Sequence, residues 1–203
     1  MQVLLIRHAL PRRSEHGEGS DPDLSEEGLA QVKRLPDALA RFPISRVVSS
    51  PQRRAIQTAE PVAAARELSV EIDERFAEYD RDLPHYVPVE QIRDENPQEW
   101  ARMAEGRLPS VVDEDAFRAR VRAAVGDLVA AADPEDTVAV FSHGGVINVL
   151  LHEILGTARL LAFPVDYASL TRLLYSRSGQ ATVATVNAVE HVWDLLPRNQ
   201  QRW

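Results

Sequence analysis

Two stretches of the chain share one hydrophobic pattern, an uninterrupted apolar run that leads directly to a histidine. Residues 3–6 read Val-Leu-Leu-Ile and are followed by Arg7 and His8, while residues 137–142 read Thr-Val-Ala-Val-Phe-Ser and precede His143. Runs without polar alternation are typical of central strands covered by helices on both faces of a parallel sheet. Ligands bind at the carboxyl ends of such strands in open α/β sheets, so both histidines are candidate site residues.

Amphipathic segments and shorter apolar runs separate these two strands and follow them. The helical spacing of apolar residues predicts helices over residues 25–39, with Ser25 as a cap, and over residues 113–132. Further helices are expected from Pro51 to about Arg66 and over residues 146–155, and further strands over residues 44–48, 70–72, 168–175 and 181–189. This alternation predicts an α/β fold, a three-layer α/β/α sandwich with a mostly parallel central sheet.

The pattern is weakest between residues 79 and 112, where prolines are frequent and periodicity is poor. We interpret this stretch as an insert, partly helical around residues 99–104, that covers one edge of the site. The expected organisation is therefore one domain over residues 1–203, with this insert at one edge of the sheet.

Composition and charge narrow the class of protein. A chain of 203 residues that is 44% hydrophobic can bury one substantial core. Its 23 Lys and Arg residues against 31 Asp and Glu residues give a net charge of −8, which argues against a nucleic acid or an anionic membrane as partner. The absence of cysteine excludes thiolate chemistry and fits a reducing compartment. Because Arg7 interrupts the first apolar run, no signal peptide or membrane span is expected there, and we expect a cytoplasmic protein.

Cationic groups recur where the pattern places the ends of strands and the starts of helices. Arg53 and Arg54 lie in the first turn of a predicted helix, where they oppose the helix dipole, and a bound anion would remove this conflict. Gly144 and Gly145 follow the second histidine at a strand-to-helix turn, where free backbone amides favour an anion. Within an acidic protein, these features predict a local pocket for a small anion.

Phosphoryl transfer is the chemistry that this set of groups fits best. Arginine side chains match phosphate oxygens and stabilise the charge that develops as phosphorus is attacked. Nearby cations keep a histidine neutral, so that its lone pair can attack phosphorus. A carboxyl group from the acidic segment 73–82 would then protonate the leaving group.

Two other kinds of site fit the sequence less well. His8, His143 and a carboxylate are possible metal ligands, but neighbouring arginines would repel a cation, so no metal is expected. Ser142 precedes His143 directly and would point to the opposite side of the strand, and no Gly-x-Ser-x-Gly elbow is present.

Three motifs in order resemble those of the histidine phosphatase superfamily, also called the phosphoglycerate mutase-like family. Arg7-His8-Ala9 resembles its Arg-His-Gly motif, with alanine in place of glycine. Residues 50–59, Ser-Pro-Gln-Arg-Arg-Ala-Ile-Gln-Thr-Ala, match its Ser-Pro-x-x-Arg-Ala-x-x-Thr-Ala helix, and residues 142–145 match its Ser-His-Gly-Gly. Weaker similarities at residues 23–28 and 187–191 extend the resemblance over most of the chain.

This resemblance implies a role for each matching residue. His8 would be transiently phosphorylated, and Arg7, Arg54, His143 and the amide of Gly144 would hold the phosphoryl group. Arg54 rather than Arg53 is implied because the arginine of the family directly precedes the alanine. Glu78 matches the acid of the Leu-x-Glu pattern, although the residues after it depart from the family, which keeps Asp80 and Glu74 as alternatives. Ser14 stands where the family has an asparagine that contacts phosphate.

The resemblance implies a phosphomonoesterase that acts in two steps through phosphohistidine, without cofactor, on a small phosphorylated metabolite, with inorganic phosphate as product. The Glu-Arg-His-Tyr-Gly segment of the mutases is missing, which favours a phosphatase over a phosphoglycerate-mutase-type phosphotransferase. A third alternative is a phosphate-binding module without catalysis. The substrate and the oligomeric state stay open. Side chains that are candidates for the pocket wall are His85, Tyr86, Arg81 and Arg12, whereas His16 and His152 are expected to be structural or solvated.

Overall fold

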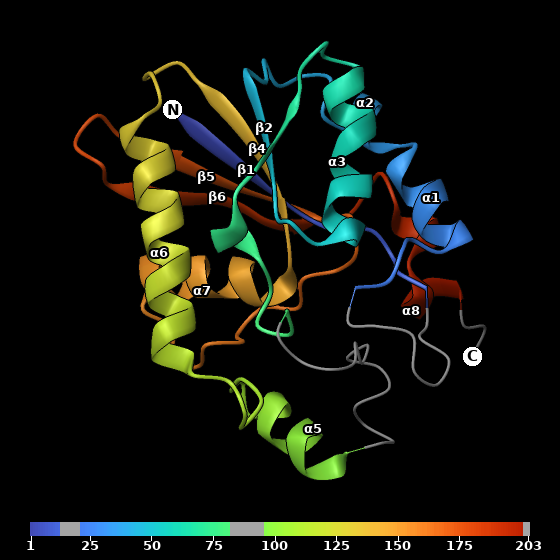
Figure 1. The fold of residues 1–203 in the computed structure, drawn as a ribbon, viewed down its shortest axis with the longest axis vertical. Coiled ribbons are helices and arrows are strands. Elements are labelled where there is room, and N and C mark those ends of the chain that lie inside the picture. Colours follow the sequence, from blue (N-terminus) through green and yellow to red (C-terminus); the bar gives the residue numbers. More distant parts are fainter. Residues whose placement is uncertain (13–20, 82–95, 201–203) are drawn as a thin grey trace.

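Strand β1 (Gln2–Arg7) lies inside a six-stranded sheet of order β3-β2-β4-β1-β5-β6 (Figure 1). The computed structural model describes residues 1–12, 21–81 and 96–200. The four strands β1 to β4 run parallel, and β5 and β6 add an antiparallel edge. The remaining strands are β2 (Arg46–Ser49), β3 (Val70–Ile72), β4 (Thr137–Ser142), β5 (Leu170–Tyr175) and β6 (Ala181–Ala188). The expected mostly parallel α/β sheet is thereby confirmed.

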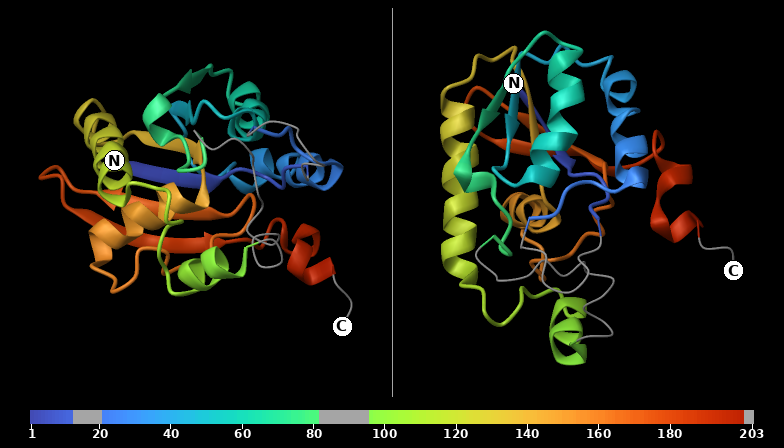
Figure 2. Two further views of the ribbon diagram at one scale, coloured as in Figure 1. Left: turned by 60° about the horizontal axis from the view of Figure 1, so that its bottom comes forward. Right: turned by 45° about the vertical axis from the view of Figure 1, so that its right-hand side comes forward.

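Helices cover both faces of the sheet, which explains why β1 shows no polar alternation. Val3 and Leu5 of β1 pack into a core with α6 (Glu114–Ala130) and α7 (Gly144–Leu155). Leu4 and Ile6 point the other way, into a core shared with α1 (Glu26–Val32), α2 (Leu35–Ala38) and α3 (Arg53–Ala64). The views in Figure 2 show these helical layers on opposite sides of the sheet. Successive strand side chains alternate between the two faces, so a strand buried on both is apolar at every position.

The first helical segment is shorter than its apolar pattern predicts. The structure breaks it into α1 (Glu26–Val32), capped as expected by the Ser25 hydroxyl, and α2 (Leu35–Ala38). Pro36 explains the break, because its ring and its missing N–H would disrupt a continuous helix. Leu29, whose spacing suggested a core position, is 46% exposed.

The helix that follows β2 also starts later than predicted. Helix α3 spans Arg53–Ala64 rather than beginning at Pro51, and Gln52 is its N-cap residue without a capping side-chain bond. The Ser50 hydroxyl, just before this helix, accepts from the Gln52 N–H at 3.3 Å and contacts the ring of His143 at 2.7 Å. Helix α7 begins at Gly144, two residues earlier than predicted, and ends as predicted at Leu155, where Gly156 follows as the C-cap residue with a left-handed φ of 63°.

The partly helical stretch expected around residues 99–104 is helix α5 (Pro97–Ala104), which lies below the carboxyl ends of β1 and β4 in Figure 1, beyond the main layers. Other short elements were not predicted: the 3₁₀ turn η1 (Glu74–Phe76) lies within the acidic segment 73–82, and η2 (Trp193–Leu195) and α8 (Pro197–Gln200) follow β6. In the described ranges, no helix combines the length and the apolar character needed to cross a membrane.

Candidate active site

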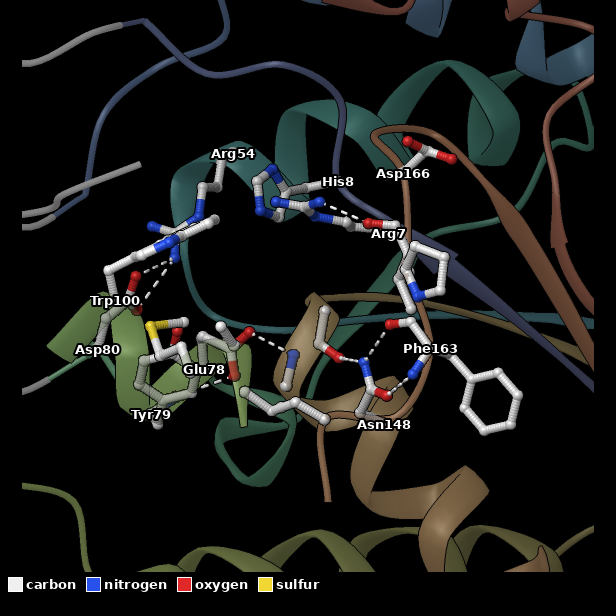
Figure 3. A pocket seen from close by; sticks show the side chains of 17 residues that line it. Arg7, His8, Arg54, Glu78, Tyr79, Asp80, Trp100, Asn148, Phe163 and Asp166 are labelled. Carbon is white, nitrogen blue, oxygen red and sulfur yellow. Dashed lines mark hydrogen bonds and ion pairs between the residues drawn. The ribbon is translucent and has the colours of Figure 1, made fainter. Parts of the chain in front are cut away.

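A cavity of about 300 Å³ opens at the carboxyl ends of β1 and β4 (Figure 3). Its walls come from segments far apart in the chain: the end of β1, the start of α3, residues 78–80, α5, the start of α7 and residues 161–166. Of the residues predicted from the sequence, Arg7, His8, Arg54, Glu78 and Gly144 line this cavity, and His143 lies beside His8 with their ring centroids 5.1 Å apart.

The imidazole of His8 is held in one orientation by its own neighbour. Its Nδ1 lies 2.8 Å from the carbonyl oxygen of Ala9, and because a carbonyl only accepts, Nδ1 carries the proton. This leaves the lone pair on Nε2. Burial, followed by the positive charges of Arg54 and Arg7, holds the pKa of His8 well below its ordinary value, so the ring is neutral near pH 7.

Arg7 is fixed at the end of β1 by contacts on two sides. Its Nη1 donates to the Val165 carbonyl oxygen at 2.6 Å, and its guanidinium lies 3.9 Å from the centroid of the Tyr167 ring. The same Tyr167 ring packs against His8 at 5.6 Å between centroids. The aromatic side chain thus supports both polar residues that β1 delivers to the cavity.

Arg54 is the buried cation of the site, with only 1% of its surface exposed. Its Nη2 donates to both carboxylate oxygens of Asp80, at 3.0 and 2.9 Å. Arg53, by contrast, is exposed and pairs with Asp23 at 2.7 Å. The carboxylate of Asp21 accepts from the Arg53 backbone N–H at 2.8 and 3.0 Å, so the protein itself places an anion at the start of α3.

His143 is fully buried, and its ring contacts the Ser50 side chain. Nε2 of His143 lies 2.7 Å from the Ser50 hydroxyl, which donates to the ring in one tautomer and accepts from it in the other. Nδ1 has no hydrogen-bond partner within the described part of the chain. Burial and the charge of Arg54 lower the pKa of His143, so the ring is neutral near pH 7 and carries one N–H.

Glu78 is a buried carboxyl group that faces the same cavity. Its Oε1 accepts from the Tyr79 N–H at 3.1 Å, and its Oε2 accepts from the Gly145 N–H at 2.8 Å. Burial, with a smaller contribution from the negative charge of Asp80, raises the pKa of Glu78 to about 7. A carboxyl group of this kind exchanges its proton close to neutral pH, as a general acid and base must.

The two alternative acids occupy different surroundings. Asp80 lines the cavity, but both of its oxygens are engaged with Arg54. Glu74 lies in η1 and pairs at 2.7 Å with Arg81, and its side chain is 60% exposed. The geometry therefore favours Glu78 among the three.

Gln52, at the start of α3, forms hydrogen bonds to the segment that carries Glu78 and Asp80, and the sequence did not indicate this role. Its Oε1 accepts from the Glu78 N–H at 2.7 Å, and its Nε2 donates to Asp80 Oδ1 at 2.9 Å. Thr58 plays a similar part, since its hydroxyl accepts from the Ala9 N–H at 3.0 Å and donates to the Arg54 carbonyl at 2.6 Å. Both side chains tie α3 to a neighbouring segment of the site, and no local pattern of residues indicates such long-range bonds.

The structure describes only some of the other candidates from the sequence. Ser14, His16, His85 and Tyr86 are outside the described residues. Arg12 and Arg81 are not among the described residues that line the cavity. His152 bonds to the Thr157 hydroxyl through Nδ1 at 3.0 Å. Within residues 1–12, 21–81 and 96–200, no three His, Asp or Glu side chains are grouped so as to hold a metal ion.

Comparison with known proteins agrees with the motifs. The model of the histidine phosphatase superfamily (branch 1) matches residues 3–188. Phosphoserine phosphatase 1 of Hydrogenobacter thermophilus is 32% identical over 108 residues, 52% of this chain and 51% of that protein. A bifunctional protein of Mycobacterium tuberculosis is 31% identical over 196 residues, 92% of this chain and 53% of that protein. The chain thus spans about half the length of these curated relatives.

Solved structures show the same fold. A mycobacterial glucosyl-3-phosphoglycerate phosphatase superposes with a TM-score of 0.76 and 27% identity, covering 92% of this chain and 98% of that one. That phosphatase has also been solved with inorganic phosphate. YhfR of Bacillus stearothermophilus gives a TM-score of 0.78 at 25% identity, covering 94% of this chain and 98% of that one.

The adjacent glycines at the start of α7 provide a matched pair of variants. A Cβ at Gly145 would lie 2.3 Å from Glu78 Oε1, whereas a Cβ at Gly144 would meet its nearest neighbour, Arg7 Nε, at 3.8 Å. We expect Gly145→Ala to lower the free energy of unfolding by about 1–3 kcal/mol, because Glu78 must move, and Gly144→Ala to change it by less than about 1 kcal/mol. Urea unfolding measures both, and equal effects would contradict the packing described for Glu78.

Proposed function

Because the chain belongs to the histidine phosphatase superfamily, we propose that it hydrolyses small phosphomonoesters in two steps, with His8 as the transient acceptor of the phosphoryl group. The phosphatases among its relatives and structural neighbours support this reaction class. The observation that carries the proposal is the state of His8: a neutral imidazole, fixed by Ala9 with Nε2 as its basic nitrogen, in a cavity that two arginines line.

In the first step, Nε2 of His8 attacks phosphorus and the bond from phosphorus to the ester oxygen breaks. Arg7 and Arg54, the ring of His143 and the amide of Gly144 hold the phosphoryl oxygens, on which negative charge concentrates. Glu78 gives its proton to the departing alkoxide, which leaves as an alcohol. Its pKa of about 7 keeps a large fraction of it protonated at neutral pH.

In the second step, Glu78 works as a base. Its carboxylate takes a proton from water, the water oxygen attacks phosphorus, and the bond from phosphorus to Nε2 breaks. Inorganic phosphate leaves, His8 is again neutral, and Glu78 is again protonated. Arg7 and Arg54 supply the positive charge in this mechanism and would repel a metal ion, so the proposal includes no metal.

Phosphate binding by a structural neighbour supports the assignment of this cavity to a phosphoryl group. Glu78 argues for catalysis rather than binding alone, since a carboxyl group facing a phosphate pocket weakens the binding of the dianion unless it carries a proton. It also provides the acid and base that hydrolysis requires.

Turnover of p-nitrophenyl phosphate in the presence of EDTA tests the proposal. The wild type is expected to release p-nitrophenol under these conditions, and His8→Ala is expected to lose at least about 10³-fold in kcat, because the nucleophile is removed. Vanadate should still raise the melting temperature of the wild type. An inactive wild type that vanadate stabilises would point instead to a binding module, and activity retained in His8→Ala would remove His8 from its proposed role.

The pH dependence of kcat/KM for an alkyl phosphate follows from the two titrating groups. Glu78 must be protonated, so kcat/KM, corrected for ionisation of the substrate, is expected to fall about tenfold per pH unit above about pH 7. His8 must be neutral, and its lowered pKa moves the corresponding acidic limb well below pH 6.5. In Glu78→Gln the rate should be low and the alkaline fall absent. A fall that persists in this variant would assign the limb to another group.

A further inference from the structure

We propose that the cavity selects phosphomonoesters whose alcohol portion is apolar and carries an aromatic ring. This inference rests on the proposed function and concerns the part of the cavity wall that α5 and residues 161–164 form. The apolar side chains of this part, the hydrogen bonds of the neighbouring Asn148 and the charges around the cavity all point to the same class of substrate.

Two separate segments contribute apolar side chains to the cavity wall. Helix α5 places Trp100, Met103 and Ala104 on the cavity, at the i, i+3 and i+4 spacing of one helical face. Leu161 and Pro164 extend the apolar surface from the loop after α7. An indole and a thioether are suited to contact the face and the edge of an aromatic ring.

Asn148 also lines the cavity, and its side-chain amide already makes hydrogen bonds within the protein. Both N–H groups of the Asn148 amide donate to backbone carbonyls, of Gly144 at 3.0 Å and of Phe163 at 3.1 Å, and its oxygen accepts from the Phe163 N–H at 2.9 Å. Asn148 therefore has no N–H left for the hydroxyl groups of a sugar or glycerol. A substrate hydroxyl beside Asn148 would find no N–H there to replace the hydrogen bond that it accepts from water.

The charges around the cavity disfavour a substrate with a second anionic group. Among the described residues that line it, Arg7 and Arg54 are the arginines, while Glu78, Asp80 and Asp166 carry carboxyl groups. Asp166 is held at the rim by Asn187 Nδ2 at 2.7 Å and by Arg198 at 2.9 Å. Once the arginines of the cavity hold the phosphoryl group, a carboxylate elsewhere on the substrate would lie near these carboxyl groups, and the arginine at the rim, Arg198, is already paired with Asp166.

Three phosphate esters of primary alcohols separate the substrate classes while keeping the bond that breaks the same. 2-Phenylethyl phosphate presents an aromatic ring, glycerol 3-phosphate presents hydroxyl groups, and O-phosphoserine presents a carboxylate and an ammonium group. We expect kcat/KM for 2-phenylethyl phosphate to exceed both others by about tenfold or more, because only its ring gains contacts with Trp100 and Met103.

Variants on α5 test whether this helix is the cause of the preference. Trp100→Ala is expected to lower the ratio of kcat/KM for 2-phenylethyl phosphate over glycerol 3-phosphate about tenfold, and Trp100→Phe should retain most of it. Gln98→Ala, on the exposed side of the same helix, is the matched control and should keep the wild-type ratio.

A wild type that prefers glycerol 3-phosphate or O-phosphoserine would overturn the inference and leave the proposed function intact. A ratio unchanged in Trp100→Ala would also overturn it. If none of the three esters nor p-nitrophenyl phosphate is hydrolysed, the proposed function itself fails and the inference fails with it.

Discussion

The buried ion pair between Arg54 and Asp80 is the interaction on which the chemistry of the site depends. It joins the start of α3 to the segment that carries Glu78, and Gln52 reinforces the same junction. Both partners also act on the titrating groups. The positive charge of Arg54 lowers the pKa of His8 and His143, while the negative charge of Asp80 raises that of Glu78. Removing one partner of such a pair typically costs about 3–5 kcal/mol, because the other is left buried and uncompensated.

The parallel pairing of β1 with β4 brings the two histidines together. Arg7 is in register with Ser142, so the residues that follow, His8 and His143, leave the sheet side by side, with a hydrogen bond from the His8 N–H to the Ser142 carbonyl at 2.8 Å. The helix that follows β4 then places Gly144 and Gly145 on the cavity and against Glu78. The carboxyl ends of these two central strands thereby bring together a candidate nucleophile, phosphate ligands and a candidate acid from four segments that are distant in the chain.

The sequence was sufficient for those parts of the structure that local pattern encodes. Two apolar runs that end in histidine predicted the central strands, and the resemblance to the histidine phosphatase superfamily is confirmed by the family match. The arginine that directly precedes Ala55 is the buried one, as its position in the motif implied, and Arg53 is exposed. The spacing of apolar residues and a short motif both involve residues that are close in the chain. Both can therefore be recognised in a single sequence.

What the sequence did not predict depends on contacts between distant residues. Nothing local marks Gln52 as the side chain that bonds Glu78 and Asp80, or Trp100 as part of the cavity wall. The apolar spacing of residues 25–39 predicted one continuous helix. In the structure, Pro36 accompanies a break into two helices. The sequence predicted a bound anion at the start of α3. It did not indicate that the carboxylate of Asp21, 32 positions before Arg53, accepts from the backbone there.

The central claim is that His8 carries the phosphoryl group during turnover. Rapid quenching of a reaction with an alkyl phosphate labelled in its phosphoryl group, followed by peptide mapping at alkaline pH, measures this directly, since phosphohistidine is labile to acid and stable to base. The account predicts label on the peptide that contains His8 and its loss on brief acid treatment, with no label in His8→Ala. Label on another residue, or hydrolysis at full rate without labelled protein at any quench time, would contradict it.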